Sequence, residues 1–146
     1  MDLLTSLKIS ASGLAANKKR MAAISSNIAN AETTRTAEGG PYRRKEVVFG
    51  SEPARETFSE ILEGEIDVNA QTVQATEVIS TNRPPILKYE PNHPDANEQG
   101  YVAKPNINVM EEMANMISAS RSYEANINAM NTTKNMAMKA LEIGRN

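Results

Sequence analysis

Apolar side chains recur at every seventh position along the first thirty residues. One series of this repeat comprises Leu7, Leu14, Met21 and Ile28, and a second comprises Leu3, Ser10, Asn17 and Ile24. Two such series, offset by three or four residues, line one helix face and are typical of a coiled-coil seam. Ser10 and Asn17 are polar seam positions, which cost stability but can fix register and partner. The pattern predicts a helix over residues 2–30 that packs on another helix.

A second seven-residue repeat runs through the C-terminal segment. Its first series comprises Val109, Met116, Tyr123, Met130 and Ala137, and its second comprises Met113, Ser120, Ile127, Lys134 and Leu141. Asn108 stands three residues before Glu111, as in a capping box, and Gly144 suits a helix end. Met is frequent in this segment, and its flexible side chain packs against non-identical surfaces. We expect a helix over residues 109–144 that is weak alone, because the segment is also rich in Asn.

The stretch between the two repeats has the character of strands and turns. The prolines all fall in it, and Gly39-Gly40-Pro41 marks a turn. Short runs of β-branched and aromatic residues predict strands at residues 46–49, 76–79 and 86–89. Residues 59–65 are weakly amphipathic and suit either a helical turn or a loop.

These patterns predict an α+β fold that is mainly α. Residues 1–32 would form an N-terminal coiled-coil helix, and residues 33–105 a small β-containing middle region with loops. Residues 106–146 would form a C-terminal coiled-coil helix that packs on the N-terminal helix. The two seams differ too much in residue choice to be an internal repeat.

Composition indicates a chain that folds with help from neighbours. Leu, Ile, Val and Phe make up fewer than one residue in five, which is low for a globular core. The net charge of -2 argues against disorder and against general nucleic-acid binding, which needs a basic excess. The absence of cysteine excludes disulfides, thiol catalysis and cysteine-based zinc sites. No apolar run approaches the roughly 20 residues that span a bilayer, and the first residues lack a signal-peptide pattern.

Two features offer candidate chemistry. His93, the only histidine, is followed by Asp95, so a general base or a metal ligand can be considered. A metal site needs several converging ligands, and a turn residue flanked by prolines is the simpler interpretation. The basic cluster Arg43-Arg44-Lys45 offers a phosphate contact, but Glu46 follows at once, so we interpret it as a solvated or protein-facing patch. No phosphate-binding loop or catalytic serine pattern is present, and we expect no enzyme, cofactor or metal.

The two terminal helices are expected to pair and to offer their remaining apolar and amide surface to other subunits. The residues expected at this assembly interface are Leu3, Leu7, Leu14, Asn17, Met21, Ile24, Asn27, Ile28, Asn30, Val109, Met113, Met116, Tyr123, Ile127, Met130 and Leu141. The alternative is a monomeric enzyme or nucleic-acid-binding module that uses His93 or the basic cluster. Such a module would be a stable monomer with buried termini, whereas an assembling subunit would not.

Several blocks of the sequence resemble one known family. They comprise Ile9–Leu14, Arg20-Met21, Ile24–Ala31, Thr33–Thr36, Glu38–Lys45, Tyr89–Asn97, Gly100–Val102, Pro105–Val109, Glu112-Met113, Ser118–Asn126 and Lys139–Gly144. The block Ser-Asn-Ile-Ala-Asn within them resembles the signature of bacterial flagellar axial proteins, which include rod, hook and hook-associated subunits. The blocks Glu-Gly-Gly-Pro-Tyr and His-Pro-Asp-Ala-Asn are similar to those of proximal-rod members. Residues 50–85 match nothing that we recognise.

The resemblance implies a structural subunit of the flagellar proximal rod, the hollow drive shaft that crosses the periplasm, transmits torque and encloses the export channel. The terminal helices would line the inner side, and the middle region would lie outside. Its partners would be other rod subunits, the rod adaptor beside the MS ring, and the flagellar type III export apparatus, in a helical assembly of like and unlike chains. The resemblance implies export without a cleaved signal peptide, and no nucleic acid, small-molecule substrate or catalytic residue.

Overall fold

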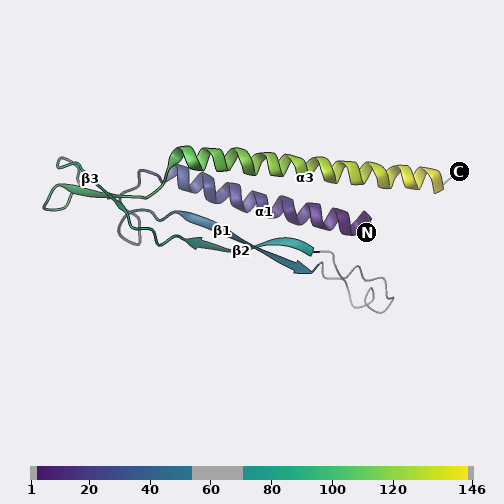
Figure 1. Ribbon diagram of the computed structural model, residues 1–146, viewed down its shortest axis with the longest axis horizontal. Helices are drawn as coiled ribbons and strands as arrows, with labels where there is room; N and C mark the ends of the chain where they lie inside the picture. Colours follow the sequence, from purple (N-terminus) through teal and green to yellow (C-terminus); the bar gives the residue numbers. More distant parts are fainter. Residues whose placement is uncertain (1–2, 54–70, 145–146) are drawn as a thin grey trace.

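The computed structural model describes residues 3–53 and 71–144. In order, these residues form helix α1 (Leu3–Ala29), strands β1 (Lys45–Pro53), β2 (Gln71–Ser80), β3 (Ile86–Tyr89) and β4 (Tyr101–Lys104), and helix α3 (Val109–Gly144). The molecule is elongated: the helices lie side by side, β1 and β2 run along α1, and β3 and β4 project at one end (Figure 1). The predicted α+β fold, mainly α, is confirmed, whereas the division into residues 1–32, 33–105 and 106–146 stays a prediction.

The two helices run antiparallel. Asn27 of α1 lies against Glu112 of α3, and Gly13 lies against Asn126. The two contacts are 14 residues apart on each helix, from 27 to 13 and from 112 to 126, which is two heptads. Because α3 has 36 residues and α1 has 27, the C-terminal end of α3 extends past the N-terminal end of α1 (Figure 1).

The buried residues of α3 stand one position before the residues of one of the two predicted seam series. Its fully buried residues are Glu112, Ala119 and Thr133, and the half-buried residues that continue it are Met116, Tyr123, Asn126, Met130 and Ala137. One predicted series thus lies on this face from Met116 onward. The prediction that the second series packs on α1 is wrong at Met113, Ile127 and Leu141, because these residues are exposed. The prediction followed apolar residues, whereas the face that packs on α1 uses mainly small and polar ones.

An N-cap sets the start of α3. Asn108 Oδ1 accepts hydrogen bonds from the backbone N–H groups of Met110 at 3.1 Å and of Glu111 at 3.4 Å. Glu111 and Glu112 stand in the first turn, where the helix dipole favours negative charge. The capping role predicted for Asn108 is confirmed.

Two antiparallel strand pairs make up the middle of the chain. In the first, the partners run from Lys45 opposite Ser80 to Pro53 opposite Gln71, with a bulge between Val48 and Phe49. The second pairs β3 with β4. The three predicted strands are therefore confirmed, and β1 and β2 are longer than expected. Strand β4 was missed, because a stretch of only four residues after a glycine is a weak signal. The stretch 59–65 lies outside the described residues.

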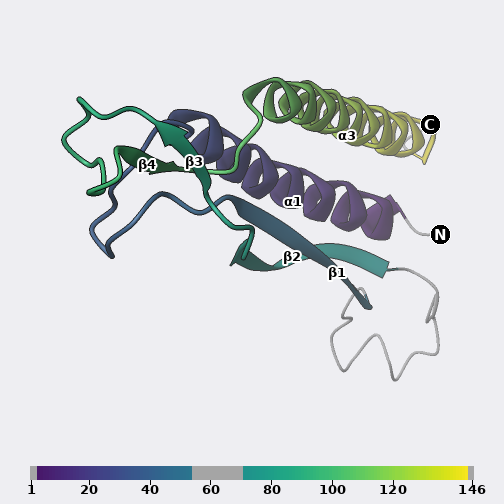
Figure 2. The same cartoon turned by 60° about the vertical axis from the view of Figure 1, so that its left-hand side comes forward.

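The β1–β2 ribbon packs on the side of α1 away from α3 (Figure 2). Ser12 Oγ accepts a hydrogen bond from the Val73 N–H at 3.2 Å, and Lys19 Nζ donates one to the Ala75 carbonyl at 3.3 Å. Ala16 and Ala23 of α1 are buried, as is Ala75 of β2. Small side chains let the helix and the ribbon approach closely, so α1 lies between α3 and the ribbon.

The β3–β4 end is fastened to the end of α1 by polar contacts. Lys104 Nζ lies 3.0 Å from Glu32 Oε2 and 3.3 Å from Glu90 Oε1. Hydrogen bonds from Lys88 and then Lys104 hold the pKa of Glu90 below its usual value. Thr34 Oγ1 donates a further hydrogen bond to Asp95 Oδ2 at 2.7 Å. The loop after α1 thereby holds the β3–β4 end in place.

A buried polar cluster joins both helices to the ribbon. Glu112 is 1% exposed and Asn27 is fully buried. Asn27 Nδ2 donates to Glu112 Oε2 at 3.0 Å and to the Lys45 carbonyl at 2.9 Å, while its Oδ1 accepts from the Lys45 N–H at 2.8 Å. The Tyr42 hydroxyl donates to the same Oδ1 at 3.1 Å. One amide side chain therefore fixes the first residue of β1 against α1 and α3.

Arg44 completes this cluster. Its Nε donates to Glu112 Oε1 at 2.8 Å, its Nη2 lies 2.7 Å from the same oxygen, and it also pairs with Glu46. Burial opposes the charge, but the carboxylates of Glu112 and Glu46 outweigh it and raise the pKa of Arg44 above its ordinary value. A buried carboxylate costs several kcal/mol unless it is paired in this way (on the order of 3–5).

Replacement of Glu112 by alanine should destabilise the chain strongly. Glu112→Ala removes the buried carboxylate that Arg44 and Asn27 share, and we expect a loss of about 3 kcal/mol in the free energy of unfolding. Urea titration followed by circular dichroism measures this loss. The matched control is Glu111→Ala, the exposed neighbour, which should cost less than ~1 kcal/mol. Equal losses in the two variants would contradict the assigned role of the cluster.

Gly13 marks a close approach between the helices. A Cβ at this position would lie 3.0 Å from Asn126 Nδ2 and 3.3 Å from its Cγ. Glycine to alanine inside a helix normally gains about 1 kcal/mol. We expect Gly13→Ala to gain nothing in the natural chain but to recover that gain in an Asn126→Ala background. A double-mutant cycle by urea unfolding tests this coupling, and additive effects would show that the contact is absent.

Candidate assembly surface

Helix α3 carries a strip of exposed apolar side chains beside its buried face. The α3 strip comprises Met110, Met113, Ile117, Ile127, Met138 and Leu141, whose exposed fractions range from 36% to 76%. Steps of three and four residues, or sums of such steps, separate these positions, so they share one helix flank. Exposed apolar side chains that gather on one flank make it a candidate interaction site.

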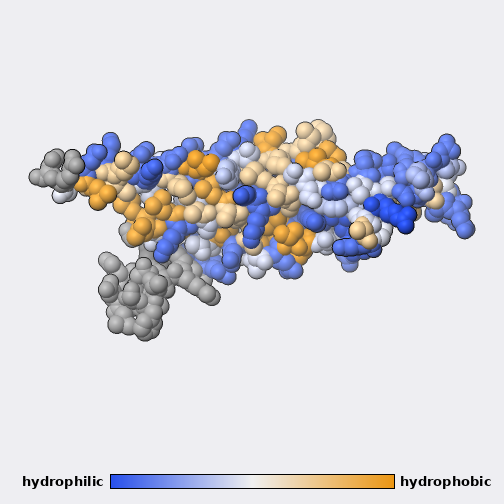
Figure 3. Space-filling view, turned by 180° about the vertical axis from the view of Figure 1, so that it is seen from behind, coloured by the Kyte–Doolittle hydropathy of each residue, from blue (hydrophilic) through white to orange (hydrophobic). Residues whose placement is uncertain are grey.

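The apolar surface is unevenly distributed over the molecule. Figure 3 shows apolar residues gathered over the helices and the ribbon on one face, whereas the end that carries β3 and β4 is mostly hydrophilic there. Leu3 and Leu4, at the start of α1, are 36% and 63% exposed, and Ile143 near the end of α3 is 78% exposed. Both chain ends therefore leave large apolar side chains in contact with solvent.

The N-terminal residues expected at an assembly interface fall into two groups. Ile24 and Asn27 are buried within the chain, so packing within the chain already occupies them. The others keep part of their surface: Leu3 is exposed, and Leu7, Leu14, Asn17, Met21, Ile28 and Asn30 are half-buried.

The C-terminal residues expected at the interface are more accessible. Val109, Met113, Ile127 and Leu141 are exposed, and Met116, Tyr123 and Met130 are half-buried. Sequence reasoning did not single out Met110, Ile117 or Met138 as interface residues. These three residues lie on the same helix flank as Met113 and Ile127, further from the buried face. Their spacing along that flank is the sequence signal that could have identified them.

The pairing of Arg44 with Glu112 was also missed. Arg44 appeared as one of three basic residues in a row, and Glu112 as one of two acids at a helix start. The structure separates the basic cluster: Arg44 is 14% exposed at its side chain and faces Glu112, while Arg43 and Lys45 are exposed. The available signal was the position of Glu112, which stands seven residues before Ala119 and fourteen before Asn126. This spacing places the Glu112 charge on the same helix face as those two residues.

His93 serves the turn between β3 and β4. The Nδ1 of His93 accepts a hydrogen bond from the Asp95 backbone N–H at 3.1 Å, and the backbone N–H of His93 donates to the Glu90 carbonyl at 3.1 Å. Within residues 3–53 and 71–144, no three His, Cys, Asp or Glu side chains converge to hold a metal ion. In the same ranges, neither helix is long and apolar enough to cross a membrane.

Comparison with known proteins identifies the family. Residues 7–35 match the family described as "Flagella basal body rod protein", and residues 98–143 match "Flagellar basal body rod FlgEFG protein C-terminal". The chain is 44% identical to the flagellar basal-body rod protein FlgC of Bacillus subtilis, over 99% of this chain and 100% of that protein. It is 41% identical to FlgC of Salmonella typhimurium, over 99% and 100%, and 40% identical to FlgC of Borreliella burgdorferi, over 98% of each. The resemblance found in the sequence blocks is confirmed: the chain belongs to the FlgC family of flagellar basal-body rod proteins.

Proposed function

We infer that this chain is a structural subunit of the flagellar basal-body rod and not an enzyme. The α3 strip is the structural feature that supports assembly most directly. Its side chains are exposed although the adjacent face of α3 has its partner in α1. Each such side chain gains about 1.5–3 kcal/mol when it is fully buried, so the strip favours contact with other subunits.

The residues proposed for this contact are those that the chain itself leaves accessible. On α3 they are the α3 strip together with Val109, Met116, Tyr123 and Met130, and on α1 they are Leu3, Leu7, Leu14, Asn17, Met21, Ile28 and Asn30. Ile24 and Asn27 contribute indirectly, because they hold α1 in place from within. Four of the accessible α3 positions, counted before the segment that extends past the end of α1, are methionines. The flexible side chain of methionine suits contacts with neighbours that are not identical.

The finer assignment is to the proximal rod, as a subunit of the hollow shaft that crosses the periplasm. The helices, with their apolar flanks, would form the inner wall around the export channel as a coiled coil. The β3–β4 end, which is mostly hydrophilic on the face that Figure 3 shows, would lie outside. Torque would pass from the ribbon to the helices through the cluster of Asn27, Arg44 and Glu112, which joins all three elements.

The proposed partners are other rod subunits of like and unlike sequence, the rod adaptor beside the MS ring, and the flagellar type III export apparatus. Export without a cleaved signal peptide fits a chain that has no cysteine, because no disulfide can form on the way. No cofactor, nucleic acid or small-molecule substrate is part of this proposal.

A carboxylate in the α3 strip should block assembly without unfolding the chain. Ile117 is 56% exposed, so Ile117→Asp should change the free energy of unfolding by less than ~1 kcal/mol. In a neighbour interface the unpaired charge must be desolvated, and incorporation into rods should fail. The measurement is the amount of subunit in purified basal bodies relative to the amount exported.

Ser118→Asp is the matched control. Ser118 is exposed, lies next to Ile117, and points to the opposite flank of α3 by helical periodicity. This variant should enter rods normally. Normal rods with Ile117→Asp would contradict the proposed interface.

On α1 we expect the same contrast between the seam and the residues beside it. Leu14→Asp and Ile28→Asp place a carboxylate at half-buried positions and should abolish rod assembly. Lys18→Asp changes an exposed position and should be milder, since exposed charges are worth less than ~1 kcal/mol. Export is expected to survive all three changes if the chain travels unfolded. Rod completion with Leu14→Asp, measured beside secretion, would show that the helix face is misassigned.

A further inference from the structure

A pocket of about 220 Å³ lies where the loop before β1 meets the linkers that follow β2 and β4. Its charged lining residues are Arg43, Arg44 and Arg83, and no carboxylate lines it. Pro84, Pro85 and Pro105 contribute apolar surface to its wall. The assignment of the chain to the rod leaves this feature without a role.

The available positive charge in the pocket belongs to Arg43 and Arg83. Arg44 is already paired with Glu112 and Glu46. Among residues 3–53 and 71–144, neither Arg43 nor Arg83 forms an ion pair, and both are exposed. Two guanidinium groups that have no carboxylate partner among the described residues therefore border a hollow with both polar and apolar walls.

The backbone that carries these two arginines is held firmly. Thr81 donates two hydrogen bonds to the Arg44 carbonyl, from its N–H and from its Oγ1, both at 2.8 Å. Asn106 Nδ2 donates to the Pro84 carbonyl at 3.3 Å, and the prolines fix their own φ angles. Because the walls are already ordered, a ligand pays little to organise them.

The Gly39–Gly40 turn leaves the pocket open at its edge. Both residues have positive φ angles, 86° and 76°, which favour glycine. An added Cβ at either position would meet nothing within 4 Å. The space beside this turn is therefore not filled by other protein atoms.

We propose that this pocket binds a glutamate or aspartate side chain of a neighbouring protein in the rod, an inference that rests on the proposed function. Guanidinium groups bind carboxylates through paired N–H donors. The proline and Tyr42 surfaces suit the aliphatic stem of a side chain, which a free inorganic anion lacks.

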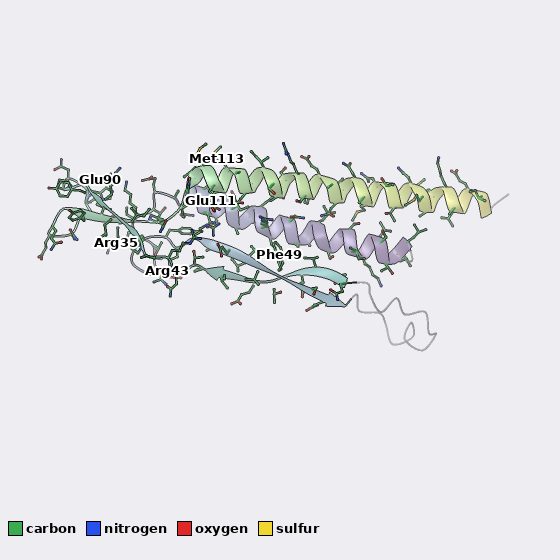
Figure 4. All side chains as sticks on the ribbon, viewed as in Figure 1. Arg35, Arg43, Phe49, Glu90, Glu111 and Met113 are labelled. Atoms are coloured by element: carbon green, nitrogen blue, oxygen red, sulfur yellow. The ribbon has the colours of Figure 1, made fainter. Side chains whose placement is uncertain are left out.

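Figure 4 places Met113 at the upper edge of α3 and Arg43 by the loop that leads into β1. Their sequence neighbours Glu112 and Arg44 are paired, so both surfaces lie at the same end of the helix pair. The pocket and the α3 strip are nevertheless lined by different residues, and their contacts are tested separately.

The test is a titration of the isotope-labelled full chain with a blocked peptide, acetyl-Gly-Glu-Glu-Gly-amide, followed by NMR. The amide signals of Gly39, Gly40 and Thr81 should shift, and the matched Gln-Gln peptide should cause no such shift. The double variant R43Q/R83Q should weaken binding about tenfold, as expected for the loss of two partly exposed ion pairs. The control R121Q removes an exposed arginine on α3 and should bind as the natural chain does.

Three results would overturn the proposal: equal binding of the Gln-Gln peptide, equal weakening by R121Q, or no binding by the natural chain. Inorganic phosphate forms a further arm, and binding of phosphate as tight as that of the Glu-Glu peptide would identify a free-anion site instead. Incorporation of the natural chain into rods, together with no peptide binding, would reject the pocket and leave the rod assignment intact.

Discussion

The arrangement of this chain depends on one buried carboxylate, that of Glu112. It is held by Arg44 from the loop before β1 and by Asn27 from α1, so a single charge brings together three segments that are distant in sequence. Because the uncompensated charge would cost several kcal/mol, on the order of 3–5, only the register that supplies both partners is stable. The antiparallel helix pair and the position of the ribbon along α1 follow from this requirement.

The same choice of residues explains why so much apolar surface stays outside. The inner faces of the helices consist mainly of small or polar side chains, among them Ala16, Ala23, Ala119 and Thr133. Such faces allow close approach, as at Gly13, but they bury little hydrophobic area. The larger side chains are left on the outer flank of α3, where a neighbouring subunit can cover them. Folding therefore uses mainly the small and polar face of α3, and the exposed apolar flank is left for assembly.

Sequence reasoning predicted the elements better than their contacts. The heptad patterns and the Asn108 cap located both helices, and β-branched runs located three of the four described strands. The predicted packing of α3 on α1 was wrong at Met113, Ile127 and Leu141, which are exposed. Apolar residues indicate a face that some partner buries, but they do not indicate whether that partner is the same chain or another one. The pairing of Arg44 with Glu112 spans 68 positions and depends on tertiary geometry, which local periodicity does not encode.

The central claim is that α3 folds the chain with its polar face and joins the rod with its apolar flank. The most direct measurement is a cryo-EM map of isolated basal bodies in which this subunit is traced. The account predicts that Glu112 stays paired with Arg44 and Asn27 inside each subunit, while Met113, Ile117 and Ile127 are covered by a neighbouring chain. A map in which these three side chains face solvent, or in which Glu112 pairs with another subunit, would contradict it.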